Sequence, residues 1–339
     1  MRITKKLLSL LLALVISLSL FGCDLSGLLD SGSGGGTQED ADFTPTVYTT
    51  VVKDSFEKTY SDQLSPNERA IYDAIVALPA GMTEVDITFP EIPTLCKGRN
   101  PNDEEMNKLS ADISSFAANA LYAAWLDHPT LFWLDHSQYS SDIVVEGDKD
   151  GIVKLTKLTL HLTLNGTADV IAQQVTALEK AVKGFKALGA TPAEKVSYIN
   201  TYLCSRIEYD LNAPNRGSLI GALVDGKCVC EGYARAFDYL CEKAGIDAVC
   251  IPGYGFTKEK PEGEGHMWNA VLLNGIYYAV DVTWNDTTKK NSYLLVGTDT
   301  ICNDTAFSAS HKPNMLTLEG PHKAFAFPAI AKLGFGITQ

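Results

Sequence analysis

The sequence is poor in basic residues. It contains 28 lysines and arginines against 41 aspartates and glutamates, which gives a formal net charge of −13 at pH 7. Binding to nucleic acid needs clustered positive charge, so this balance argues against a nucleic-acid partner. The chain also lacks internal repeats of the kind that build solenoids. Its length of 339 residues and its hydrophobic content of 45% predict a globular protein that can bury a sizeable core.

Long apolar runs are scarce as well, and the first lies near the start of the chain. Three basic residues precede an apolar stretch from Leu7 to Phe21, which is shorter than a typical membrane span and has the layout of an export signal. The tetrapeptide Leu-Phe-Gly-Cys that ends at Cys23 resembles a bacterial lipobox, in which the cysteine is lipidated and becomes the new N-terminus. An ordinary signal peptide cleaved nearby is the alternative.

The lipobox predicts an exported protein that a lipid anchors to the cell membrane on its extracytoplasmic side. Residues 1–23 would be the signal peptide and lipobox, and the Gly/Ser-rich and then acidic segment 24–53 would be a flexible tether. Seven of the eight cysteines remain after lipidation. Because this number is odd, at least one thiol is expected to be free or reactive.

Helix signals dominate the next part of the chain. The sequence SPNE at 65–68 combines a capping box with proline at the first helical position, and an apolar stripe from Leu109 to Ala124 has the helical period. Farther on, leucines alternate with polar residues from Leu158 to Leu164, which is typical of a strand. We therefore expect three regions: a mainly helical N-terminal region with a β-hairpin over 54–165, a second domain over 166–320 and a C-terminal tail over 321–339.

Two cysteines in the sequence GKCVCEGYARAF stand directly before a predicted helix. From Cys230 onwards, apolar and small residues recur with helical spacing, so Cys230 lies in the first turn. The positive end of the helix dipole and the unpaired backbone N–H groups there stabilise a thiolate and could hold an oxyanion. The alternative for Cys230 is a small buried core residue, as we expect for Cys241 and Cys250.

A β-hairpin is predicted over residues 266–284. The pair Asn274-Gly275 between two β-rich runs is a strong signal for a two-residue turn. Counting from that turn places His266 and Asp281 on one face as diagonal neighbours, within reach of each other. Asp281 could then hold one imidazole nitrogen and leave the other to deprotonate a thiol. The helix of Cys230 is expected to cover this face.

Three motifs in this order, GKCVCEGYARAF, GHMWNAV and YYAVDVTWND, closely resemble the transglutaminase-like superfamily in its bacterial, cell-surface branch. The resemblance covers roughly residues 170–300. It implies an α+β, papain-like core in which the cysteine helix packs on an antiparallel sheet. The matched positions imply Cys230 as the nucleophile, since it alone is followed by x-G-Y-A, with His266 as the base and Asp281 as the third member of a triad.

The resemblance also implies chemistry that passes through a thioester. Water as the acceptor gives a peptidase or amidase, and an amine gives a transglutaminase. Nothing in the chain resembles the calcium sites or flanking β-domains of animal transglutaminases. The expected reaction is therefore hydrolysis of a peptide or isopeptide bond in a protein, peptide or cell-wall substrate, without a cofactor. Protein crosslinking and a non-catalytic, surface-binding scaffold are the alternatives.

Other residues near the motifs receive lesser roles. Gly232, Tyr233 and Trp268 lie beside the matched positions and are expected to shape the cleft. The charged loop 256–265 leads into His266 and could form a flap. His311, ahead of Lys-Pro-Asn, matches a histidine often found after the last core strand of the family, and it is given no catalytic role.

A metal-binding module is a further alternative. Four cysteines and one histidine supply both ligand types that zinc favours: Cys228, Cys230, Cys241, Cys250 and His266. The arrangement C-x-C, followed by cysteines along a helix and a strand, lacks the paired C-x-x-C layout of zinc sites. The sequence therefore predicts no metal site.

Overall fold

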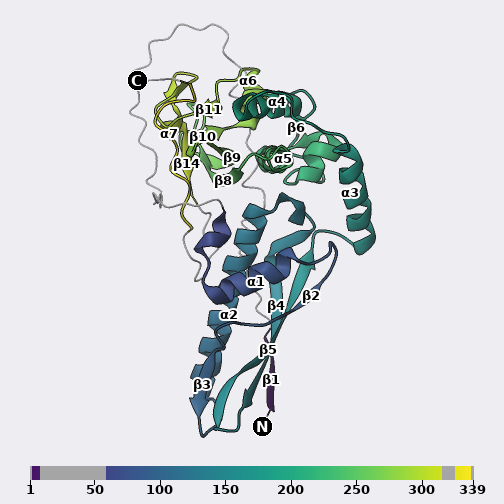
Figure 1. The fold of residues 1–339 in the computed structure, drawn as a ribbon, viewed down its shortest axis with the longest axis vertical. Coiled ribbons are helices and arrows are strands. Elements are labelled where there is room, and N and C mark those ends of the chain that lie inside the picture. Colours follow the sequence, from purple (N-terminus) through teal and green to yellow (C-terminus); the bar gives the residue numbers. More distant parts are fainter. Residues whose placement is uncertain (1, 8–58, 315–324, 337–339) are drawn as a thin grey trace. The chain divides into compact units, whose positions relative to one another are not determined.

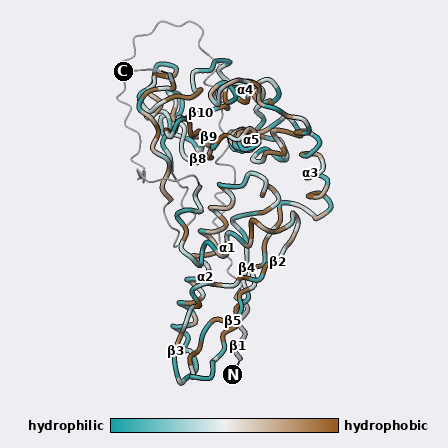
Figure 2. Tube along the Cα trace, in the orientation of Figure 1, coloured by the Kyte–Doolittle hydropathy of each residue, from teal (hydrophilic) through white to brown (hydrophobic). Residues whose placement is uncertain are grey.

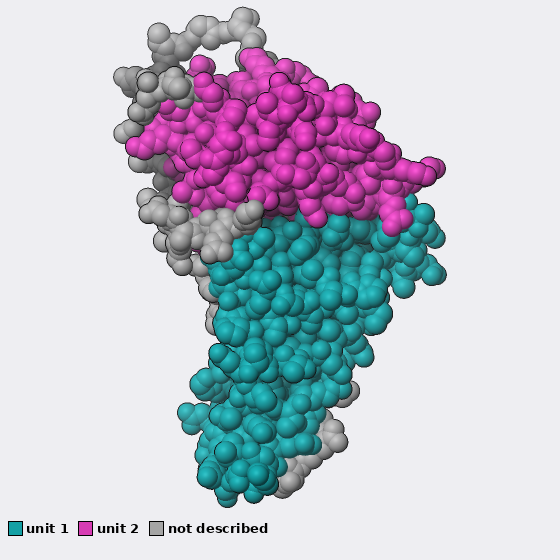
Figure 3. All heavy atoms as spheres, viewed as in Figure 1, with its two compact units in different colours: residues 1–15, 59–176, 317–323 teal, residues 16–58, 177–316, 324–339 magenta. Residues whose placement is uncertain are grey.

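The computed structural model describes residues 2–7, 59–314 and 325–336 (Figure 1). They belong to two compact units, coloured separately in Figure 3. Described residues 2–7 and 59–176 form the first unit, and 177–314 and 325–336 form the second. The proposed lipidation site Cys23, the tether and residues 321–324 and 337–339 of the proposed C-terminal tail lie outside the described residues.

An antiparallel sheet of five strands forms the first unit's framework. Its order is β1-β4-β5-β2, and β3 also pairs with β5. The long hairpin of β4 and β5 carries buried leucines at alternate positions, as the sequence pattern predicts. The strands are β1 (Arg2–Leu7), β2 (Glu84–Ile87), β3 (Thr94–Lys97), β4 (Leu134–Gly147) and β5 (Ile152–Leu164). Part of the expected signal peptide, Arg2–Leu7, thus pairs along β4 at the sheet edge.

The first unit also contains the helices α1 (Pro66–Val76) and α2 (Asp103–Asp127), with the short helical turns η3 (Tyr60–Gln63) and η4 (Pro129–Leu131). Helix α1 begins with the predicted capping box, in which the Ser65 side chain accepts from the Glu68 N–H and the Glu68 carboxylate accepts from the Ser65 N–H. Helix α3 (Ala168–Ala181) crosses the division between the units, which falls after Thr176.

The second unit is a mixed helix and sheet structure built on a five-stranded antiparallel sheet in the order β11-β10-β9-β8-β14. Its central strands and α5 carry many buried apolar residues. Figure 2 colours the hydrophobic stretches of the chain brown. The strands are β8 (Ala248–Gly255), β9 (Glu264–Leu273), β10 (Ile276–Val280), β11 (Leu294–Val296) and β14 (His311–Pro313). The helices are α4 (Pro192–Cys204), α5 (Cys230–Lys243), α6 (Val282–Thr288) and α7 (Phe307–Ser310). The predicted α+β class is confirmed.

Short elements complete the second unit. They are the parallel pair β6 (Glu208–Tyr209) and β7 (Lys227–Cys228), the π-helical turn η5 (Gly221–Asp225), and the pair β12 (Ile301–Cys302) and β13 (Thr305–Ala306). Among the helices of the described chain, none combines the length and the apolar character needed to cross a membrane.

The predicted hairpin is present, but its second strand is shorter than expected. Asn274 and Gly275 both have positive φ angles, as a tight two-residue turn requires, and Leu273 pairs with Ile276. The β-rich sequence predicts a strand that continues to Trp284, whereas β10 ends at Val280. The strand ends there because the Asp281 carboxylate accepts the Trp284 N–H at 3.0 Å and caps α6.

The face on which α5 packs also differs from the expectation. The side chain of Asn269 in β9 donates to the Ala234 carbonyl of α5 at 3.0 Å. Asn269 and His266 lie three positions apart on one strand, so their side chains leave opposite faces. The body of α5 therefore packs on the face that carries Asn269, while the first residue of the helix, Cys230, is hydrogen-bonded to His266.

Candidate active site

The fully buried Cys230 is the first residue of α5. Val229 occupies the N-cap position and gives the first turn no side-chain hydrogen bond. A thiol at such a helix start lies in the positive field of the helix dipole, which favours its thiolate. The sequence predicts that Cys230 lies in the first turn of the helix. This is confirmed, because Cys230 is the first residue of α5.

Gly232 allows this helix start to lie close to the preceding chain. A Cβ atom at Gly232 would lie 2.5 Å from the Cβ of Cys228 and 2.7 Å from the carbonyl oxygen of Arg216. No side chain fits at either distance, so the first turn of α5 needs glycine here. Gly232 serves the placement of Cys230, whereas the sequence analysis expected it to shape a cleft.

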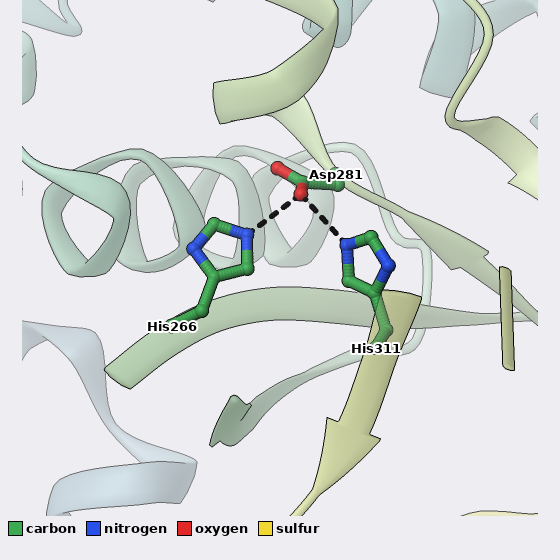
Figure 4. Close-up of side chains that lie close together, drawn as sticks. All are labelled: His266, Asp281 and His311. Carbon is green, nitrogen blue, oxygen red and sulfur yellow. Dashed lines mark hydrogen bonds and ion pairs between the residues drawn. The ribbon is translucent and has the colours of Figure 1, made fainter. Parts of the chain in front are cut away.

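The imidazole of His266 joins the other two predicted site residues. Its Nε2 atom lies 2.7 Å from Oδ2 of Asp281 (Figure 4). Its side chain is also hydrogen-bonded to the side chain of Cys230. Since Nε2 is engaged by the carboxylate, Nδ1 is the nitrogen left for the thiol. The structure thus brings Cys230, His266 and Asp281 together, with His266 in the middle.

Burial and charge act in opposite directions on this group. Burial by itself lowers the pKa of His266, but the Asp281 carboxylate and the Cys230 side chain outweigh it, and the pKa of His266 is raised. For Asp281, burial alone raises the pKa, whereas hydrogen bonds and charge from His266 and His311 lower it further than burial raises it. An imidazolium next to a carboxylate is therefore the favoured state of this pair.

A second histidine contacts the same carboxylate oxygen. Nε2 of His311 lies 3.0 Å from Oδ2 of Asp281, and its Nδ1 lies 2.9 Å from Oγ of Ser310 (Figure 4). Sequence reasoning missed this role, because His311 follows Asp281 by thirty positions and belongs to a strand, β14, that was not predicted. Its residue type, next to the sequence Lys-Pro-Asn, was the one available signal.

The strand β8 lies between the two histidines and carries glycines where they need space. His266 of β9 pairs with Gly253, and His311 of β14 pairs with Gly255. Directly paired residues point to the same face of a sheet, so both imidazoles extend over this part of β8. A Cβ at Gly255 would lie 3.0 Å from the Trp284 ring and 3.3 Å from the His266 ring. A Cβ at Gly253 would instead lie 2.7 Å from the Trp268 ring and against the Lys312 carbonyl. Gly255 thus leaves room for the rings of His266 and Trp284, and Gly253 leaves room for Trp268 and β14.

Aromatic rings enclose the two imidazoles. The Trp268 ring lies 5.9 Å from that of His266 and 5.0 Å from that of His311. The Trp284 ring lies 5.2 Å and 4.4 Å from the same two rings. Such a wall keeps water away, which strengthens hydrogen bonds and charge interactions inside it. Trp268 thus lies beside His266 as the sequence analysis expected, but it is buried in this wall.

Tyr233 has a different position from the one expected. It is fully buried, and its hydroxyl donates to Oδ2 of Asp286 at 2.6 Å. This bond joins α5 to α6, the helix that Asp281 caps. Tyr233 therefore fixes the two helices that present Cys230 and Asp281 and does not face the imidazoles.

A group of potential metal ligands is present, but it differs from the cysteine set considered above. Ligand atoms of His266, Asp281 and His311 all lie within 4.8 Å of one another. Two imidazoles and a carboxylate suit several transition metals. Both Nε2 atoms and the carboxylate oxygen already form the hydrogen bonds described, and an ion there would replace the contact between His266 and Asp281.

The chain was compared with known proteins. Residues 179–282 match the family model of the transglutaminase-like superfamily. This part of the chain is transglutaminase-like. That superfamily includes cysteine peptidases and acyl transferases. The matched segment contains Cys230, His266 and Asp281, and it ends before His311.

Two curated relatives are kyphoscoliosis peptidases. The protein from Homo sapiens is 35% identical over 144 residues, which cover 38% of this chain and 22% of the relative. The protein from Mus musculus is 34% identical over 159 residues, which cover 41% of this chain and 24% of the relative. The chain thus spans less than a quarter of the length of these relatives.

The solved structures that match the chain share little sequence with it. A structure described as a TGase is 16% identical, with a TM-score of 0.29, over 42% of this chain and 43% of the other. A putative cysteine protease from Cytophaga hutchinsonii is 18% identical, with a TM-score of 0.27, over 43% of this chain and 65% of the other. These scores are too low for either structure to bear on the mechanism.

The substitution Asp281→Asn should destabilise the protein in a pH-dependent way, when tested in a Cys230→Ala background that removes the thiol. The raised pKa of His266 adds stability that is complete below its unfolded pKa of about 6.5 and is lost as the pH rises through the raised value. The lowered pKa of Asp281 adds stability above about pH 4. The free energy of unfolding in urea should therefore fall by about 3 kcal/mol near pH 5.5 and by less near pH 9.

A matched control is Asp286→Asn in the same background. Asp286 is also buried in α6, but its partners are Tyr233 and Lys289 and not a histidine. Its loss of stability should be similar at the two pH values. If Asp281→Asn lowered the free energy of unfolding equally at the two pH values, the carboxylate would not hold His266 as an ion pair.

Proposed function

We propose that the protein is a membrane-anchored, extracytoplasmic thiol enzyme that hydrolyses peptide or isopeptide amide bonds through Cys230, His266 and Asp281. One observation carries the proposal. The buried cysteine at the start of α5 is hydrogen-bonded to an imidazole whose other nitrogen lies 2.7 Å from a buried carboxylate. A nucleophile, a base and a group that orients the base are the requirements for catalysis by a thiol.

Before the substrate reacts, Nδ1 of His266 already holds the thiol proton of Cys230, so the two groups rest as an imidazolium and a thiolate. The thiolate sulfur attacks the carbonyl carbon of the substrate, and backbone N–H groups at the start of α5 stabilise the oxyanion that forms. When the intermediate collapses, the bond from carbon to nitrogen breaks and the imidazolium gives its proton to the leaving amine. The product is a thioester between Cys230 and the acyl part of the substrate.

In the second half, water replaces the amine. The oxygen of the water attacks the thioester carbon while His266 takes a proton from that water. The bond from carbon to sulfur then breaks. A carboxylic acid leaves, and the thiolate of Cys230 and the imidazolium of His266 are restored. Throughout, Asp281 keeps the ring oriented and stabilises the imidazolium without taking its proton.

The acceptor of the acyl group separates hydrolysis from protein crosslinking. The kyphoscoliosis relatives are named peptidases, which favours water as the acceptor. An amine in place of water would complete the same thioester chemistry as an acyl transfer. A surface scaffold without activity would need none of the hydrogen bonds between Cys230, His266 and Asp281.

Alkylation rates test the nucleophile. In the folded, reduced protein we expect iodoacetamide to modify Cys230 faster than any other cysteine near pH 5, because only a thiolate reacts and His266 stabilises it. Burial raises the pKa of Cys228, Cys241 and Cys250, which should react slowly. Peptide mass spectrometry at several values between about pH 5 and pH 8 gives the rates.

The control for this experiment is His266→Ala, which should remove the advantage of Cys230 at acidic pH. Cys96, which is more accessible than Cys230, reports reaction governed by exposure alone. If Cys96 reacts first and Cys230 stays inert at every pH, the proposed catalytic function is wrong and the scaffold becomes the better hypothesis.

Product analysis tests the acceptor. The protein is incubated with an unfolded protein substrate such as casein in ¹⁸O-labelled water, with methylamine added as a competing nucleophile. We expect products with one ¹⁸O atom per new carboxylate to exceed methylamide products, and Cys230→Ala to give neither. A majority of methylamides would identify an acyl transferase instead.

The membrane anchor is proposed from the sequence around Cys23. Cys23→Ser should move the protein out of the membrane fraction of a bacterial host that processes lipoproteins, whereas His266→Ala should not. Cleavage there would also remove β1 from the sheet of the first unit, so an intact mass measurement tests the same step. A membrane fraction that is unchanged by Cys23→Ser would contradict the lipid anchor.

A further inference from the structure

The carboxylate of Asp281 has more donors than a Cys-His-Asp arrangement needs. Its Oδ1 atom accepts the Trp284 N–H at 3.0 Å, and its Oδ2 atom is shared by His266 at 2.7 Å and His311 at 3.0 Å. We infer that His311 is a positioning residue, whose hydrogen bond to Asp281 holds the carboxylate and, through it, holds the His266 ring with Nδ1 towards Cys230. This inference rests on the proposed function.

The partners of His311 determine which nitrogen carries its proton. An ionised carboxylate has no proton to donate, so the contact with Asp281 needs a proton on Nε2 of His311. Nδ1 is then an acceptor for the hydroxyl of Ser310, whose Oγ lies 2.9 Å away. The same hydroxyl lies 3.2 Å from the Phe307 carbonyl, its alternative acceptor. Ser310 thus holds the tautomer of His311 that donates to Asp281.

The environment keeps His311 neutral while His266 is protonated. The ring of His311 is stacked on Phe307, with ring centres 4.1 Å apart, and lies against Trp284. Burial and the neighbouring His266 lower the pKa of His311 to about 4, although Asp281 acts in the opposite direction. Near neutral pH, one positive and one negative charge therefore balance within the three groups, and His311 contributes only a neutral donor.

The extra donor matters because a terminal carboxylate rotates easily. The last torsion of an aspartate side chain is broad and about two-fold, so its orientation has to be fixed by hydrogen bonds. Without His311, Oδ2 of Asp281 would keep His266 as its one side-chain donor. The Trp284 N–H would still hold Oδ1, but Oδ2 and the imidazole could then turn together about that bond, which would misalign Nδ1 of His266 with the thiol.

His311 also connects the site to the C-terminal part of the described chain. It begins β14, on the far side of β8 from His266 and outside the segment that matches the family model. Gly255 of β8 leaves space for the His266 ring, and Gly253 leaves space for the Trp268 ring and the Lys312 carbonyl of β14. The three strands thus bring two histidines to one carboxylate.

The test compares His311→Gln with His311→Met in the full chain. A glutamine amide can place an N–H close to the position of Nε2, whereas methionine has a similar length and no donor. We expect His311→Met to slow the alkylation of Cys230 near pH 6 by about ten-fold or more, the usual scale for loss of a supporting hydrogen bond. His311→Gln should slow it by less than about three-fold.

Packing alone would predict the opposite order, because methionine suits an aromatic environment better than an amide does. Phe307→Leu is the matched control, since it removes a ring stacked on His311 but no donor to Asp281. It should lower the melting temperature and leave the rate at Cys230 nearly unchanged. Equal rates in the Met and Gln variants would overturn the inference.

A second measurement keeps this inference separate from the proposed function. Should wild-type Cys230 lack fast alkylation, the proposed function fails, and ¹⁵N spectra of labelled histidine then test His311 alone. We expect one His266 signal with protons on both ring nitrogens in the wild type and in His311→Gln, and more than one His266 signal in His311→Met. Identical His266 signals in all three proteins would contradict a positioning role.

Discussion

The site of the second unit depends on the burial of one carboxylate, that of Asp281. An isolated charge in such an environment is very costly, so it persists only where several donors surround it. Its donors come from different parts of the chain: His266 from β9, Trp284 from the start of α6, and His311 from β14. The backbone N–H of Asp281 also donates to the Tyr293 carbonyl at 2.9 Å. Because each donor needs its own element in place, the carboxylate links the assembly of these elements to the geometry of the site.

The two histidines show how environment assigns different states to one residue type. Both rings are buried against the same oxygen, yet the pKa of His266 is raised and that of His311 is lowered. The difference lies in their other neighbours. The second nitrogen of His266 is available to the Cys230 side chain, which gains from a positive charge, whereas that of His311 lies against the Ser310 hydroxyl in an aromatic enclosure. One imidazole can therefore move a proton and the other can only donate a hydrogen bond.

The environment also gives the cysteines different tendencies to ionise. None of the seven in the described part of the chain forms a disulfide bond. Burial raises the pKa of Cys228, although it is only two positions from Cys230. Cys230 has the start of a helix and an imidazole beside it, and Cys228 precedes the helix in the short strand β7. Proximity in sequence thus does not make the two thiols chemically alike.

The sequence by itself determined the features that depend on neighbouring residues. The capping box of α1, the tight turn at Asn274 and Gly275, and the position of Cys230 at a helix start all follow from interactions within a few residues. The α+β class and the association of His266 with Asp281 followed from the same turn and from the family resemblance. The predicted end of β10 was wrong. The β-rich sequence favoured a longer strand, whereas in the structure Asp281 ends the strand and caps α6.

Only the tertiary structure decided what surrounds that carboxylate. The pairing of β14 with β8 brings His311 to Asp281. The need for Gly253 and Gly255 also appears only in the folded chain, where they lie against the rings of Trp268, Trp284 and His266. No local pattern encodes these contacts, since their residues are far apart in sequence and meet through the order of strands in the sheet. Strand order is fixed by the packing of the whole core, which the spacing of residues along the chain does not specify.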